Sequence, residues 1–138
     1  MKAISLTQPW ATLVVIGAKR FETRSWRTRY RGPLLIHAAK GFPKSAQAMC
    51  QAEQFRLALW AAGCDLAPLL TGMLLGTGDV TDCRKIGQQD RPSEPELSFG
   101  DYTPGRFAWR LENPRLLPKH IAYVGALGVF NVPDEVLS

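Results

Sequence analysis

Glycine and proline residues divide this chain into short segments that alternate apolar and polar side chains, and this punctuation restricts the possible folds more than any other feature. Such segments are typical of β-strands. They cover residues 3–6, 20–25, 34–38, 74–81, 106–111 and 124–130. We therefore expect an α+β protein with five or six strands, although periodicity alone does not distinguish a barrel from a sandwich.

Two stretches follow the periodicity of a helix instead. Pro9 suits the first turn of a helix, which Thr7 or Gln8 would cap and Gly17 would end. The apolar face of this helix would carry Trp10, Leu13 and Val14. A longer helix is predicted within residues 43–63, because apolar side chains recur there every three or four positions. These side chains belong to Ala48, Ala52, Phe55, Leu59 and Ala62.

The length of 138 residues is that of one domain, which we expect to span residues 1–138. No apolar run reaches the roughly 18 residues that a membrane-spanning helix needs, and no signal peptide is evident. The expected location is therefore the cytoplasm, with no membrane partner. Three scattered cysteines and two histidines form no metal-ligand pattern, so neither a metal site nor a cofactor is predicted.

Positive charge is concentrated near the N-terminus. The first 44 residues contain nine of the 17 lysines and arginines but one acid, Glu22, although the whole chain has a net charge of only +5. Residues 17–32 combine six cations with Phe21, Trp26 and Tyr30. A local positive field of this kind attracts polyanions, and aromatic rings between the charges favour nucleic acid over a merely solvated basic surface.

Within this block, residues 20–25 alternate like a strand. Glu22 and Arg24 would share one face, and Phe21 and Thr23 the other. A carboxylate among so many cations is expected to stay ionised. Glu22 would then either pair with Arg24 or Lys19 and fix their geometry, or accept a hydrogen bond from a ligand.

The same block carries a family resemblance. Gly17, Lys19, Glu22 and Arg24 fit the motif GxKxxExR, and QPWA, YRG and IHAAK flank it. With the downstream FGDYTPGRFAWRLENP and VGALGVF segments, the chain resembles the ASCH domain (activating signal cointegrator homology) over nearly its whole length. The resemblance implies a PUA-like fold, a small curved β-barrel flanked by helices, with a motif-lined cleft proposed to bind RNA.

Site residues are expected around this cleft, with RNA or a nucleotide as the ligand. Lys19 would contact a phosphate, and Arg24 a phosphate or a base edge. Trp26 would stack on a base or pack in the core, and Trp10 is expected in the core beside the cleft. The predicted nucleic-acid-binding set is Gln8, Trp10, Lys19, Glu22, Arg24, Trp26, Arg27, Arg29 and Lys40.

A second class of function is an enzyme. Some proteins that this chain resembles are hydrolases, either ribonucleases or amidohydrolases that deacylate modified cytidine. Lys19 and Glu22 would then be catalytic. The deacylase branch uses a threonine three residues after the motif lysine, where this chain has Glu22. No Ser/His/Asp pattern or Gly-rich phosphate loop supports catalysis independently.

Residues 87–105 form a long polar connection rich in Pro and Gly. Connections of this length are either binding lids or solvated loops. The connection contains four acidic residues, which suit a solvated loop as well as a binding lid: Asp90, Glu94, Glu96 and Asp101.

Overall fold

A computed structural model describes residues 1–64 and 68–138. Its strands are β1 (Lys2–Leu6), β2 (Phe21–Arg24), β3 (Gly32–Ala38), β4 (Met73–Lys85), β5 (Phe107–Ala122) and β6 (Val129–Asn131). Its helices are α1 (Trp10–Val15), α2 (Lys44–Met49) and α3 (Glu53–Ala61), with 3₁₀ turns η1 (Glu96–Phe99) and η2 (Asp134–Val136). The predicted α+β class is confirmed. No described helix has the length and hydropathy that crossing a membrane would require.

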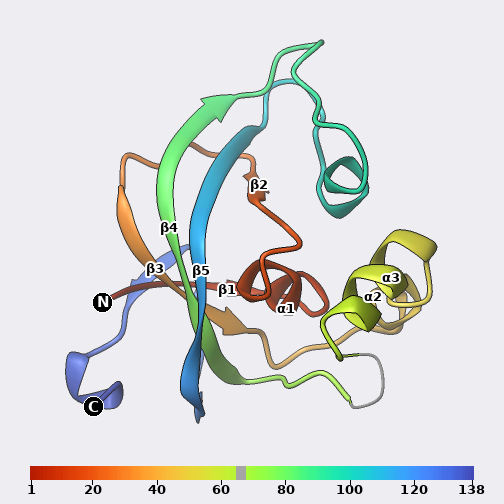
Figure 1. Cartoon of the computed structure of the whole chain (residues 1–138). Coiled ribbons are helices and arrows are strands. Elements are labelled where there is room, and N and C mark those ends of the chain that lie inside the picture. The colour runs from red at the N-terminus through yellow and green to blue at the C-terminus, as the bar shows by residue number, and fades with distance from the viewer. Residues whose placement is uncertain (65–67) are drawn as a thin grey trace.

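The six strands form one mixed sheet in the order β2-β5-β4-β3-β1-β6. Only β1 and β3 run parallel, and all other neighbours are antiparallel. Figure 1 shows β4 and β5 bending around α1. The expected barrel does not form in the described part of the chain, because β2 and β6 lie at opposite edges of the sheet and do not pair with each other.

The core lies on both faces of this sheet. On the concave face, Val14 and Val15 of α1 pack against buried residues of β3, β4 and β5. Leu13 points the other way and contacts Phe55 and Leu59 of α3 and Phe99 of η1. Helix α1 is therefore fixed between the sheet and the α3–η1 layer, as Figure 1 shows, and the segment that follows it is held on a rigid support.

The predicted long helix over residues 43–63 is wrong. It is divided into α2 and α3 because Ala52 adopts an extended conformation (ψ 141°) and Glu53 begins a new first turn. Phe55 and Leu59 are buried as expected, but the alanines at 48, 52 and 62 are exposed. Small side chains gain little from burial, so they do not enforce one continuous apolar stripe.

Strand boundaries also differ from the prediction at the C-terminal half. β5 continues past Leu111 to Ala122 despite Pro114 and Pro118, because two of the three register irregularities in its ladder with β4 lie at these prolines. The strand predicted at 124–130 shrinks to β6. Val124 and Leu127 lie outside it and are exposed.

Gly76 permits the closest approach between β4 and its neighbours. An added Cβ would lie 2.2 Å from the Arg115 carbonyl oxygen and 3.1 Å from Val15 Cγ1. We predict that Gly76→Ala lowers the free energy of unfolding by about 1–3 kcal/mol, because the β5 backbone must move. Urea denaturation measures the change.

Gly78→Ala is the matched control two residues further along β4. Its Cβ would meet Leu111 Cβ at an ordinary 3.7 Å, so stability should change by less than about 0.5 kcal/mol. Equal effects of the two substitutions would contradict this account of the β4–β5 packing.

Candidate functional site

Lys19 has the most unusual environment of the predicted site residues. It is only 2% exposed, although it lies in the connection between α1 and β2. Gly17 ends the helix with a φ of +84°, and the Lys19 N–H then donates to the Leu13 carbonyl at 2.9 Å. The ammonium donates to the Phe21 carbonyl and lies 3.4 Å from Glu22 Oε1. Lys19 is therefore a buried, partnered cation.

Glu22 binds a second cation through its other oxygen. Arg24 Nε donates to Glu22 Oε2 at 2.8 Å, and Arg24 Nη2 donates to the Ser5 carbonyl at 3.3 Å. The sequence predicted that Glu22 pairs with Arg24 or Lys19, and in the structure it pairs with both. The antiparallel ladder of β2 with β5 positions the two side chains on one face, as the alternation predicted.

A cavity of about 490 Å³ opens at this ion network, and we call it the Glu22 pocket. Its volume is within the range of small-molecule sites. Four chain segments form this pocket: the end of β1, the start of α1, β2 with the preceding Lys19, and the region around η1. The lining residues are Ser5, Leu6, Thr7, Trp10, Lys19, Glu22, Thr23, Arg24, Ser98, Phe99, Gly100 and Asp101.

The far wall of the Glu22 pocket comes from the long connection over residues 87–105. Glu96 Oε1 accepts the Arg20 N–H at 2.8 Å, and Thr23 Oγ1 accepts the Asp101 N–H at 3.1 Å. Phe99 is fully buried against Phe55, with ring centroids 5.0 Å apart. This part of the connection is therefore a docked wall of the pocket.

Behind this wall lie two buried polar groups. Tyr102 is 6% exposed and Glu96 is 4% exposed. Burial raises the pKa of the Tyr102 hydroxyl well above its usual value, and the negative charges of Glu96 and Glu22 raise it further. Among the described residues, neither the Tyr102 hydroxyl nor Glu96 Oε2 has a hydrogen-bond partner. Tyr102 therefore stays protonated and neutral at neutral pH.

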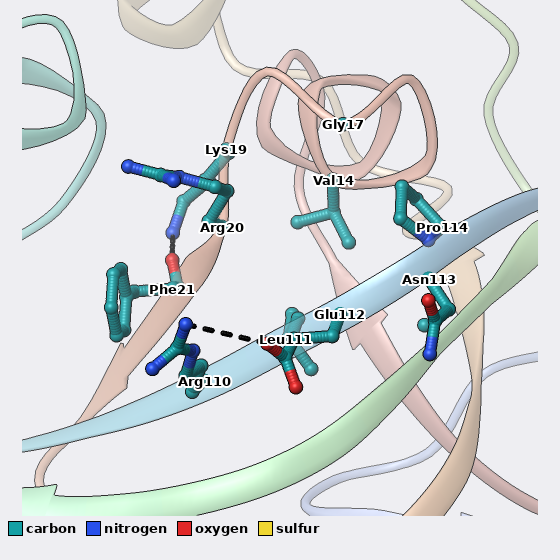
Figure 2. Close-up of a pocket in the computed structure, with 11 residues that line it drawn as sticks. Val14, Gly17, Lys19, Arg20, Phe21, Arg110, Leu111, Glu112, Asn113 and Pro114 are labelled. Atoms are coloured by element: carbon teal, nitrogen blue, oxygen red, sulfur yellow. Dashed lines mark hydrogen bonds and ion pairs between the residues drawn. The ribbon is translucent and has the colours of Figure 1, made fainter.

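A second cavity, of about 420 Å³, lies beside the same segment toward β5. Figure 2 shows its lining, with the Lys19 ammonium turned toward the Phe21 carbonyl and Arg110 directed at Glu112. The Arg110 guanidinium lies 3.3 Å from the Glu112 carboxylate, and both side chains are about half exposed. Glu22 and Arg24 do not line this second cavity, so fewer residues of the GxKxxExR motif line it than line the Glu22 pocket.

Gln8 and Trp10 contribute differently. Gln8 is completely buried, its amide donates to the Leu70 carbonyl at 2.9 Å, and its oxygen accepts the Thr12 N–H at 3.0 Å. Its side chain thus stabilises the start of α1. Trp10 packs edge-on against Phe55, with centroids 5.9 Å apart, and it also lines the Glu22 pocket.

The other predicted residues lie outside the Glu22 pocket. Trp26 is 37% exposed and packs edge-on against Trp109, and the Arg27 guanidinium lies 5.3 Å from the centre of the Phe107 ring. Arg29 and Lys40 are exposed. The predicted set therefore divides into a pocket group, a surface group and the buried Gln8, which lines no part of the Glu22 pocket.

Several pocket residues were not predicted. Ser5 carries no sequence signal, and Thr7 was predicted only as a candidate helix cap. Ser98, Gly100 and Asp101 reach the pocket only through tertiary folding. The unusual length of the 87–105 connection was the one available hint.

The family model of the ASCH domain matches residues 4–119. Activating signal cointegrator 1 of Homo sapiens is 34% identical over 115 residues, which is 81% of this chain and 19% of that protein. Its Mus musculus counterpart is 37% identical over 102 residues, 70% of this chain and 17% of that protein. The chain thus spans less than a fifth of these curated relatives.

Two solved structures also resemble this one. Both are variants of ZmASCH from Zymomonas mobilis, with TM-scores of 0.55 and 0.50 and 14% identity. Each covers 98% of this chain, and the matches cover 91% and 89% of the two ZmASCH chains. At this identity the likeness concerns the fold alone.

The buried Lys19–Glu22 pair gives a stability prediction. Glu22→Gln removes the anion and leaves the Lys19 ammonium buried, so the free energy of unfolding should fall by about 3 kcal/mol. Adding Lys19→Met to that variant should recover at least half of the loss, because the uncompensated charge disappears. A double-mutant cycle in urea measures the coupling. If Glu22→Gln alone unfolds at the wild-type urea concentration, the ion network is not a structural requirement.

Proposed function

This chain belongs to the ASCH domain family, whose fold is PUA-like, and we propose that it binds single-stranded RNA by taking one nucleotide into the Glu22 pocket. The observation that carries the proposal is the arrangement at the pocket floor. One carboxylate there orients the guanidinium of Arg24 while an aromatic side chain, Trp10, forms part of the wall.

Arg24 is the cation best placed to contact a ligand. Its side chain is 24% exposed, whereas that of Lys19 is 1% exposed. Glu22 and Ser5 occupy its Nε and one Nη2 position, and its remaining N–H groups have no partner in residues 1–64 and 68–138. A guanidinium fixed in this way can donate two parallel bonds to a phosphate or to a base edge.

The opposite wall supplies groups suited to ribose. The Ser98 hydroxyl donates to Glu94 at 2.7 Å, so its oxygen is left as an acceptor, and the Asp101 carboxylate lines the same wall. Hydrogen bonds from the Thr103 hydroxyl and backbone hold the pKa of Asp101 below its usual value, so this group is an acceptor at neutral pH. Acceptors of this kind recognise the 2′-hydroxyl that distinguishes RNA from DNA.

Binding can be tested with a matched pair of arginine variants. Arg24→Gln should weaken binding of single-stranded RNA at least tenfold, because a charge-assisted contact is lost. Arg115→Gln removes an ion-paired surface arginine from β5, outside the pocket, and should leave affinity nearly unchanged. Fluorescence anisotropy at constant salt measures both. An equal loss in the two variants would show that only net charge matters.

A hydrolase in the same pocket is the second candidate, with Lys19 and Glu22 as catalytic groups. The geometry favours it less, because the Lys19 ammonium already donates to two acceptors and Glu22 already accepts from two cations. We therefore expect no cleavage of RNA and no release of acyl groups from acylated nucleosides, measured by chromatography after incubation. Product that appears with wild type and disappears with Lys19→Ala would establish the enzyme instead.

A further inference from the structure

A second basic site lies beyond the Glu22 pocket, where the connection between β2 and β3 meets the end of β4. A hollow of about 590 Å³ there is bordered by side chains from both segments. We call it the arginine hollow, and its lining residues are Arg27, Thr28, Arg29, Arg31, Cys83, Arg84 and Lys85. Three of the five cations come from the basic block of the sequence, and two come from a strand that the sequence places far from it.

Most of these cations lack a carboxylate partner. Arg84 is paired with Asp82 at 2.7 Å, and this bond lowers the pKa of the Asp82 carboxyl, so that pair is neutral overall. In the described part of the chain, the other four cations of the hollow form no ion pair. Like charges gathered at one place repel each other, and a bound polyanion would remove this repulsion.

Two of the arginines are held in place without an acid. Arg31 Nη1 donates to the Thr28 and Tyr30 carbonyls at 3.2 and 2.9 Å. The guanidinium of Arg27 lies over the Phe107 ring. These contacts orient the guanidinium groups without a direct ion pair, although the Asp82 carboxylate attracts Arg31 from a longer distance. Such an arrangement is expected of a surface organised to receive an anion.

The Glu22 pocket and the arginine hollow differ in how the charges of their cations are balanced. In the pocket, one carboxylate serves two cations, and one of those cations is buried. In the hollow, four cations are exposed and form no ion pair with the residues that the structure describes. Attraction to phosphate should therefore be concentrated in the hollow, and recognition of a nucleotide by hydrogen bonds in the pocket.

The two sites are close along the chain. Arg24 lines the pocket and Arg27 lines the hollow, and three residues span at most about 10 Å. In the sequence, Trp26 lies between Arg24 and Arg27, and its side chain is 37% exposed. A base that leaves the pocket toward the hollow can stack on this ring, which requires that the base be unpaired.

We propose that the arginine hollow binds the phosphate backbone of a single-stranded nucleic acid while one nucleotide of the same strand occupies the Glu22 pocket. This inference rests on the proposed function, and it adds Arg31 and Lys85 to the binding surface. It assigns most of the salt-dependent affinity to the hollow.

The test compares two double variants that remove the same charge. R29Q/K85Q acts in the hollow, where both side chains are exposed and make no described hydrogen bond or ion pair. K44Q/K119Q removes two exposed lysines elsewhere, at the start of α2 and on β5, which form no ion pair within residues 1–64 and 68–138. The probe is a fluorescein-labelled oligouridylate of about 12 nucleotides, within the site sizes of single-strand binders. Affinity is measured from low to moderate salt.

R29Q/K85Q should reduce the slope of log affinity against log salt by about 1.4, because each phosphate contact on a single strand contributes about 0.7. Each single variant should remove about half of that. K44Q/K119Q should retain the wild-type slope. Thermal unfolding of all variants checks that the fold is kept.

Three results would overturn the proposal, and they are distinguishable. Equal slope losses in both double variants would mean that net charge alone acts. An unchanged slope in R29Q/K85Q, with binding still weakened by Arg24→Gln, would reject the hollow but retain the pocket. Absence of oligouridylate binding by wild type would reject the proposed function together with this inference.

Discussion

The Glu22 carboxylate, shared between the Lys19 ammonium and the Arg24 guanidinium, connects the exit of α1 to β2 and to the end of β1. Withdrawing a lysine from water costs several kcal/mol, and here an anion and a backbone carbonyl offset that cost. The order of the motif follows from this geometry. Gly17 turns the chain, Lys19 points inward, and Glu22 and Arg24 alternate onto one face of a strand.

This network also decides what the pocket can do. Because Glu22 neutralises the buried lysine, the pocket is polar without being strongly positive, and Arg24 remains as the accessible donor. The positive charge that is evident in the sequence lies instead at the arginine hollow, around the connection between β2 and β3. In complexes with nucleic acids, contacts to phosphates position the strand and contacts to bases recognise it. A polar pocket beside a cationic surface fits binding in which different residues make these two kinds of contact.

Local patterns predicted part of this arrangement. The alternation over residues 20–25 correctly grouped Glu22 with Arg24, because strand geometry is set by neighbouring residues. The burial of Lys19 was not predictable, since it depends on the packing of α1 between sheet and η1. The pocket wall at Gly100 and Asp101 was not predictable either, because it depends on contacts between residues far apart in the sequence. The hydrogen bond from the Asp101 N–H to Thr23 Oγ1 joins residues 78 positions apart. Periodicity overestimated the helix at 43–63 because alanines resemble an apolar face without needing burial.

The most direct test of the Glu22 pocket as the binding site is a titration of ¹⁵N-labelled protein with single-stranded oligouridylate, followed by NMR. We expect the largest chemical-shift changes at the Trp10 indole N–H, the Arg24 Nε–H and the Gly100 amide, which come from three separate segments of the pocket. Signals of α2 should remain unchanged. Changes confined to α2 and α3 or to β6, with these three signals unmoved, would contradict the account.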